Sequence, residues 1–161
     1  MVGYGNPFRG DDGFGPLAAG LVEERGLADM EVIVSRQLNP ELAIPLSRAQ
    51  YAVFLDAEVG DEPGRLRAAA VEPCGAGSGS HHFEPATLLA LAQGVFGHAP
   101  PATLITATAA TFQHGVEISP EVSLAASAAA RAIALLAASR QWDNALLSTA
   151  LRRECASPCT S

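Results

Sequence analysis

Two adjacent aspartates, Asp11 and Asp12, are well placed to do chemistry. They follow the glycine-rich segment GYGNPFRG and directly precede an apolar run with helical spacing. In one interpretation an aspartate is the N-cap of that helix, where its carboxylate accepts unpaired amide protons. Capping accounts for one aspartate and leaves the other available. Carboxylates repel phosphate and the segment lacks the G-x-G-x-x-G pattern of dinucleotide sites, so the loop suits a cation or a metal-bearing partner.

The segment before these aspartates contains a Gly-x-Gly turn at Gly3 and Gly5. Glycine has no Cβ and tolerates positive φ, so such a turn lets the backbone come close to a neighbouring segment. Asn6 follows the turn and can brace it by hydrogen bonding to its own backbone. We therefore expect Gly3, Gly5 and Asn6 to position the site.

Asp56 and a pair of histidines, His81 and His82, are the next candidates along the chain. Asp56 follows the apolar segment YAVFL, and the histidines follow the stretch GAGSGS. Two carboxylates and one imidazole form a mixed set that suits nickel or zinc and leaves coordination positions open. The alternatives are that Asp56 caps a turn and that the histidines are exposed without a role. His98 and His114 have weaker claims.

Strand-like and helix-like segments alternate around these residues. Apolar, β-rich segments predict strands at Met1–Tyr4, Met30–Val34, Tyr51–Leu55, Leu66–Val71 and Thr103–Thr108. Helices are predicted after Asp12, after Asn39 with Pro40 at the first position, from about Pro85 to Val95, and from the cap Ser119 towards Ser139. The two kinds of element thus take turns along most of the chain.

This alternation predicts a three-layer α/β fold, in which a twisted, mostly parallel sheet of about five strands has helices on both faces. In open sheets of this kind, ligands bind beyond the carboxyl ends of the strands. Asp12 follows the first strand, Asp56 follows a later one, and the strand at Leu66 leads into His81. We expect these three side chains to converge on one edge, with Asp11 as a cap or a supporting residue.

Composition narrows the class of protein. Among 161 residues, 17 Asp and Glu stand against 10 Lys and Arg, which disfavours nucleic-acid binding. We expect no apolar run close to the roughly 20 residues that span a bilayer, and the N-terminus lacks the basic and apolar regions of a signal peptide. We expect a cytoplasmic monomer that contacts no membrane.

The three cysteines fit the same compartment. Cys74 is isolated, while Cys155 and Cys159 lie in a polar tail, and an odd total does not indicate a disulfide framework. The Cys-x-x-x-Cys spacing could bind metal or oxidise, but two thiols alone make a poor metal site, so we treat them as incidental. We expect one α/β domain over residues 1–140 and a peripheral, partly mobile tail over residues 141–161.

Four blocks of the sequence resemble, in the same order, those of the hydrogenase maturation endopeptidases. They read GYGNPFRGDDGFGPLAAGLVEE, LDAEVGDEPG, SHHFEPATLLALA and FQHGVEISPEV, and together they span roughly residues 3–137. The resemblance implies a twisted α/β sheet with helices on both faces. It also implies a peptidase that removes the C-terminal extension of a nickel-iron hydrogenase large-subunit precursor after nickel insertion, with that precursor as its partner.

The resemblance further implies roles for individual residues. An acidic residue in the first loop, an aspartate after the third strand and a later histidine contact metal in this family, and they correspond to Asp12, Asp56 and His81, with His82 as a fallback. The metal is the nickel of the substrate, so we expect no permanently bound cofactor, although zinc or another divalent ion could bind in vitro. Whether metal-activated water attacks, or Asp11 or Asp56 acts as general base, stays open.

Three other functions compete with this one. A non-catalytic checkpoint or chaperone could bind the nickel-loaded large subunit through the same residues. The segment GYGNP also resembles the start of peptidyl-tRNA hydrolases. Those enzymes lack the DDGFG continuation, and they bind RNA, which the acidic net charge of this chain disfavours. A self-sufficient zinc peptidase is the third. Family members usually have more apolar residues before the glycine loop than MVGYG provides, so we expect either that the natural start lies upstream or that the chain is truncated.

Overall fold

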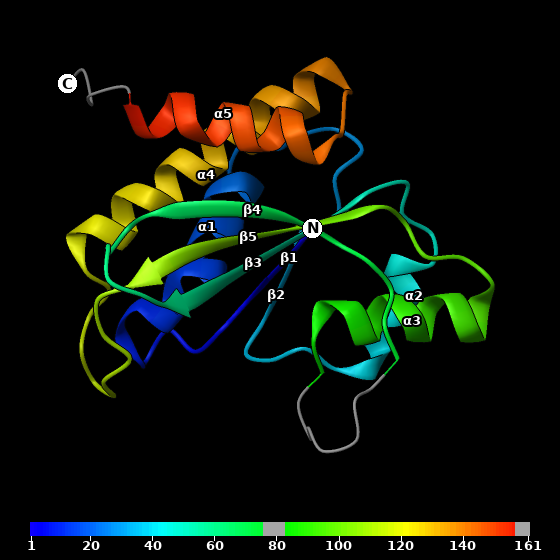
Figure 1. The fold of residues 1–161 in the computed structure, drawn as a ribbon, viewed down its shortest axis with the longest axis horizontal. Helices are drawn as coiled ribbons and strands as arrows, with labels where there is room; N and C mark the ends of the chain where they lie inside the picture. The colour runs from blue at the N-terminus through cyan, green and yellow to red at the C-terminus, as the bar shows by residue number, and fades with distance from the viewer. Residues whose placement is uncertain (76–82, 157–161) are drawn as a thin grey trace.

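A five-stranded sheet forms the centre of the protein in a computed structural model that describes residues 1–75 and 83–156 (Figure 1). The strands are β1 (Val2–Tyr4), β2 (Ile33–Ser35), β3 (Ala52–Val59), β4 (Leu66–Val71) and β5 (Ala102–Ala109), in the spatial order β2-β1-β3-β5-β4. The pairs of β1 with β2, β1 with β3 and β3 with β5 are parallel, and β4 runs antiparallel to β5. The predicted α/β class with a mostly parallel sheet is confirmed.

Helices cover both faces of this sheet. They are the 3-10 helices η1 (Gly10–Gly13) and η2 (Pro40–Leu42) and the α-helices α1 (Phe14–Glu23), α2 (Ala43–Leu46), α3 (Pro85–Phe96), α4 (Pro120–Ser139) and α5 (Asn144–Ala156). Figure 1 shows α1, α4 and α5 on one side of the sheet and α2 and α3 on the other. Each side has its own apolar cluster, the first around Phe14 and Ile133 and the second around Phe54 and Leu88. The fold therefore has the three layers predicted from the sequence.

The predicted helix starts at Asn39 and Ser119 are confirmed. The Asn39 side chain accepts a hydrogen bond from the Glu41 N–H at 3.1 Å, and the Ser119 hydroxyl accepts one from the Val122 N–H at 3.4 Å. In both cases a proline follows the cap at the first helical position, where no intrahelical N–H is needed. Local sequence signals thus define these two helix starts.

The predicted strand at Met30–Val34 is shifted in the structure, where β2 covers Ile33–Ser35. β2 pairs with β1 alone, from Val2 opposite Ile33 to Tyr4 opposite Ser35, so the three residues of β1 limit its length. By contrast, β3 extends beyond the predicted Leu55 to Val59, because it pairs with β5 over its full length. Strand ends depend on the partner strand, which a local pattern does not contain.

The prediction of a peripheral tail from residue 141 is wrong for α5. Leu147 and Leu151 are 0% and 3% exposed and belong to the same apolar cluster as α1 and α4. α5 also packs against β4, and the Arg131 guanidinium on α4 pairs with the Glu154 carboxylate on α5. Polar residues separate these leucines in the sequence, so the apolar face of α5 was not recognised there. Cys155 lies within α5, and Cys159 lies outside the described residues.

The prediction that no apolar segment approaches membrane-spanning length is wrong for helix α4. It has 20 residues, and an 18-residue window within it has a mean hydropathy of 1.6, so it is long and apolar enough to cross a bilayer, although 50% of this window is buried inside the protein. A single helix of this kind is weak evidence for a membrane, because the core helix of a layered fold meets the same criteria. The alanines that face α1 and the sheet account for its apolar character.

Candidate functional site at the carboxyl ends of β1 and β3

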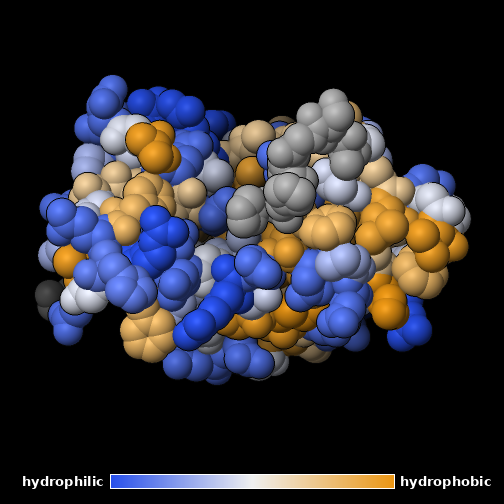
Figure 2. All heavy atoms as spheres, turned by 90° about the horizontal axis from the view of Figure 1, so that it is seen from below, coloured by the Kyte–Doolittle hydropathy of each residue, from blue (hydrophilic) through white to orange (hydrophobic). Residues whose placement is uncertain are grey.

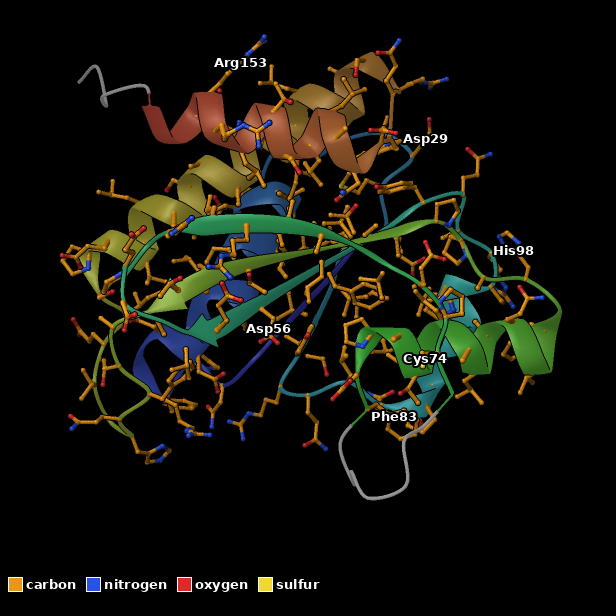
Figure 3. The ribbon with its side chains drawn as sticks, in the orientation of Figure 1. Asp29, Asp56, Cys74, Phe83, His98 and Arg153 are labelled. Atoms are coloured by element: carbon orange, nitrogen blue, oxygen red, sulfur yellow. The ribbon has the colours of Figure 1, made fainter. Side chains whose placement is uncertain are left out.

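The pairing of β1 with β3 brings two separate parts of the chain together at the carboxyl end of the sheet. Val2 lies opposite Phe54 and Gly3 opposite Leu55, so the next residues, Tyr4 and Asp56, end up next to each other. Figure 3 shows Asp56 on β3, towards the end of that strand. The expectation that the first loop and Asp56 share one sheet edge therefore agrees with the observed topology.

Glycines let helix α1 lie very close to this sheet edge. A Cβ added to Gly3 would be 2.3 Å from the carbonyl oxygen of Gly15, and one added to Gly15 would be 2.3 Å from that of Tyr4. Real Cβ atoms do not tolerate such distances, so any larger residue would push α1 away from β1. The position of η1, which precedes α1 and carries Asp11 and Asp12, depends on this close contact.

Asp12 is fixed by the turn that the sequence predicted. Gly5 adopts a φ of +135°, and a Cβ there would be 2.0 Å from the Asp12 carbonyl oxygen. The Asn6 N–H donates to Asp12 Oδ2 at 3.0 Å, and Asn6 Oδ1 accepts from the Phe8 N–H at 3.1 Å. The predicted bracing by Asn6 is confirmed. Asp12 remains partly exposed, so its carboxylate is oriented by the loop and accessible to a ligand.

Asp11 is completely buried and joins the first loop to the segment between β5 and α4. Its Oδ2 accepts from the N–H groups of Ala110 at 2.7 Å and Thr111 at 3.1 Å, and its Oδ1 accepts from the Ser119 N–H at 2.6 Å. Burial alone would raise the pKa of Asp11, but these N–H donors lower it below its usual value. Asp11 does not cap α1, whose N-cap is Gly13, and of the two expected roles the supporting one fits.

Asp56 differs from Asp11 because its charge is poorly compensated. The pKa of Asp56 is raised to about 6, chiefly by burial and also by the negative charges of Asp12 and Glu58, whereas hydrogen bonding with the Tyr4 hydroxyl and the Ala57 N–H opposes the shift. Two carboxylates that repel each other at a sheet edge are a favourable environment for a cation, since a cation removes the repulsion. A perturbed carboxyl group of this kind is also a frequent feature of functional sites.

His81 and His82 lie outside the described residues, so the structure does not place the third predicted ligand. The chain resumes at Phe83, which packs against the same cluster as Tyr4, and the Glu84 charge acts on the Tyr4 hydroxyl. Within residues 1–75 and 83–156 no group of three or more His, Cys, Asp or Glu side chains could hold a metal ion. The structure therefore describes Asp12 and Asp56, two of the three predicted metal ligands, and the histidine stays a prediction.

The other two histidines differ in position. His98 Nε2 is 3.2 Å from the carbonyl oxygen of Ala49, in loops that precede β5 and β3, so His98 lies at the opposite end of the sheet. His114 is exposed in the segment after β5, and its neighbour Gly115 donates its N–H to the Phe8 carbonyl oxygen at 2.8 Å. The position of His98 at the opposite end of the sheet agrees with the prediction that it is a weaker candidate ligand than His81 or His82.

Tyr4 is the residue that sequence reasoning missed. Burial raises the pKa of its hydroxyl, and the negative charge of Asp56 and hydrogen bonding to that carboxylate raise it further. The signal lies in the register, because Tyr4 and Asp56 each come one residue after the last position at which β1 pairs with β3. A predicted pairing of the first and third strands would have placed the two residues together.

The fold and this site define a class of α/β proteins whose ligands bind at the carboxyl edge of a mostly parallel sheet. No protein-family model matches the chain, and no curated protein matches it. Solved structures do. The chain is 25% identical to the NiFe hydrogenase maturation protease HycI from Thermococcus kodakarensis KOD1, with a TM-score of 0.67 over 85% of this chain and 90% of that one.

Two further structures agree with this match. The chain is 28% identical to the hydrogenase 2 maturation peptidase from a Thaumarchaeota archaeon, with a TM-score of 0.60 over 85% of this chain and 94% of that one. The hydrogenase maturating endopeptidase HybD from E. coli shares the fold at 19% identity, with a TM-score of 0.62 over 86% and 91% of the two chains. Over most of its length, and at low sequence identity, the protein is a structural match to the hydrogenase maturation proteases.

Proposed function

We propose that this protein is an endopeptidase that removes the C-terminal extension of a nickel-iron hydrogenase large-subunit precursor, and that it recognises the nickel already inserted in that precursor. The precursor is its partner in this proposal, and the cytoplasm is the compartment. The observation that carries the proposal is the placement of Asp12 and Asp56 at one sheet edge in a chain that shares its fold with maturation proteases.

The chemistry of the two carboxylates supports nickel as the feature that is recognised. Asp12 is oriented by the Asn6 N–H, and Asp56 has a raised pKa because of burial and neighbouring negative charge. A cation that arrives with the substrate relieves this repulsion, so binding favours a metal-loaded precursor over a metal-free one. His81, which lies two residues before Phe83, supplies the third ligand in this proposal.

Positioning accounts for most of the proposed catalysis. The nickel of the substrate contacts Asp12, Asp56 and His81, and this contact holds the peptide bond to be cut beside the loop of Gly5 and Asn6. A fixed orientation of the reacting groups can lower the barrier by several kcal/mol, up to about 10. The loop can provide such an orientation because α1 and the Asp11 hydrogen bonds restrain it on two sides.

Cleavage of a nickel-loaded precursor tests the proposal. The protein is incubated with the precursor, and loss of the C-terminal extension is measured by mass spectrometry. We expect cleavage by the wild-type protein and a loss of at least about a hundredfold in rate for Asp12→Asn and His81→Ala, because each removes a metal contact. A nickel-free precursor should stay intact.

Two control variants make the result specific. Asp61→Asn removes an exposed carboxylate from the turn after β3, and His98→Ala removes a histidine at the opposite end of the sheet. Both should cleave at the wild-type rate. Nickel-dependent binding of the precursor without any cleavage would reject the peptidase and favour a checkpoint or chaperone.

A further inference from the structure

The side chain of Phe8 is exposed although its backbone is firmly held. Its exposed fraction is 60%, while its N–H donates to Asn6 Oδ1 at 3.1 Å and its carbonyl oxygen accepts from the Gly115 N–H at 2.8 Å. An aromatic ring on a restrained loop loses little conformational entropy when a partner covers it, so it is suited to act as an anchor. Phe8 is two residues from Asn6, whose N–H binds the Asp12 carboxylate.

An arginine from another segment lies over this ring. The Arg36 guanidinium carbon is 5.6 Å from the centre of the Phe8 ring, within the range of a cation–π contact. Arg36 directly follows β2, and the Gly5 N–H donates to the carbonyl oxygen of Ser35 at 3.2 Å, which ties the end of β2 to the first loop. The Phe8–Arg36 pair is therefore attached to the same loop that holds Asp12.

The charge of Arg36 is not neutralised by the surrounding protein. Arg36 forms no ion pair with any residue in the described ranges 1–75 and 83–156, whereas Arg65, Arg67, Arg131 and Arg140 pair with carboxylates. The whole chain has a net charge of −7, so the guanidinium of Arg36 beside an exposed ring is a local positive charge on an acidic protein. Such groups attract a carboxylate in a bidentate geometry.

We propose that Phe8 and Arg36 form a docking site for an acidic peptide segment of the substrate, next to the candidate metal contacts. This inference rests on the proposed function in one respect, namely that the substrate is a polypeptide. A carboxylate of the segment binds the Arg36 guanidinium, and an adjacent apolar side chain packs on the Phe8 ring. Asp12 and Asp56 repel the same carboxylate, so it stays on the arginine side and fixes the register of the peptide.

Binding of two matched peptides tests this site. One octapeptide has Glu-Phe-Glu at its centre, the other has Gln-Phe-Gln, and each is titrated into the full-length protein while backbone amide shifts are followed by NMR. We expect the wild-type protein to bind the acidic peptide roughly three- to tenfold more tightly, with shifts centred on Phe8, Arg36 and Gly115. Arg36→Ala should abolish the preference for the acidic peptide, and Phe8→Ala should weaken the binding of both peptides about threefold or more.

Matched controls separate a local effect from a general one. Arg25→Ala removes an exposed arginine just after α1, and Phe96→Ala removes a partly exposed phenylalanine at the end of α3. Both should keep the preference of the wild-type protein. Equal binding of the two peptides, no detectable binding of either, or an unchanged preference in Arg36→Ala would each overturn the docking site.

The docking site and the proposed peptidase activity can fail separately. Asp12→Asn should lose precursor cleavage and keep the peptide preference, because Phe8 and Arg36 are intact. A wild-type protein that prefers the acidic peptide but leaves the nickel-loaded precursor uncut would retain the docking site and reject the peptidase. Cleavage at the wild-type rate by Phe8→Ala and Arg36→Ala would retain the peptidase and reject the docking site.

Discussion

The two ends of the sheet hold their polar groups in different ways. At the carboxyl end, Asp11 and Asp12 accept hydrogen bonds from backbone N–H groups of loops. At the opposite end, a cavity of about 600 Å³ is lined by residues that include Tyr51, Arg140 and Trp142. There the rings of Tyr51 and Trp142 stack at 5.6 Å, and the Tyr51 hydroxyl lies 2.6 Å from Thr103 Oγ1.

This difference shows that the cavity and the candidate functional site are at separate places. The ion pair of Arg140 and Asp29 beside the cavity is well solvated, since the two side chains are 81% and 77% exposed. The carboxyl groups with shifted pKa, Asp11 and Asp56, lie at the other end. The shifted carboxyl pKa values and the restrained geometry therefore favour the carboxyl end of the sheet as the candidate site. Figure 2 adds that hydrophobic surface gathers on the side of α2 and α3.

Asp11→Asn is expected to have the largest effect on stability. An amide can accept on one oxygen only, so its NH₂ group would face N–H donors of Ala110 and Thr111 or of Ser119. The free energy of unfolding should fall by about 2–4 kcal/mol, as measured by urea denaturation. Asp29→Asn at the opposite end is the control and should change it by less than about 0.5 kcal/mol.

The pH dependence of Asp11→Asn gives an independent check. The pKa of Asp11 is lowered in the folded protein, so its stabilising effect is present above about pH 4, the usual value of the unfolded chain, and is lost as the pH falls below it. The difference between wild type and variant should shrink with acid. A constant difference down to pH 3 would contradict the hydrogen-bonded carboxylate.

Asp56→Asn should have a smaller effect of opposite sign. The folded pKa of about 6 lies above the unfolded value, so Asp56 favours the folded state fully below about pH 4, and this contribution is lost as the pH rises through about 6. The variant lacks this loss. Its stability relative to wild type should rise by about 1–2 kcal/mol between pH 4 and 7, as measured by thermal or urea unfolding across this range. A flat difference would show that Asp56 titrates normally.

Tyr51→Phe should have the smallest effect and no consequence for cleavage. It removes the hydroxyl that bonds Thr103, while Thr103 keeps its hydrogen bond to Asn144 Oδ1 at 3.3 Å. We expect a loss of about 1 kcal/mol in the free energy of unfolding. The rate of precursor cleavage should equal that of wild type, and a clear decrease would mean that the two ends of the sheet are coupled.

The fold was predictable from the sequence where local signals decide the structure. Patterns of a few residues predict the caps at Asn39 and Ser119, the apolar segments of β3 and β5, and the glycine turn. The ends of β2 and β3 were not predictable, because they depend on the lengths of β1 and β5. α5 was missed because its buried leucines are separated by polar residues that face solvent.

The site was predictable in its residue types and less so in its contacts. The topology brings the loop of Asp12 to the end of β3, and Asn6 braces the turn as expected. The partners of Asp11 were out of reach, since Ala110 and Ser119 belong to a segment whose path the sequence does not define. The Tyr4 hydroxyl beside Asp56 was missed for a related reason, namely that it requires the register of two strands.

The hydrogen bonds of Asp11 also set an order of events during synthesis and folding. They join residues that are 99, 100 and 108 positions apart in the sequence. Contacts this distant form late, because the chain entropy of a long loop must be lost before they stabilise anything. The first loop leaves the ribosome well before Ser119 does, yet it reaches its final shape only after Ser119 has been made. A chain that is cut short before α4 therefore carries the residues of the site without its geometry.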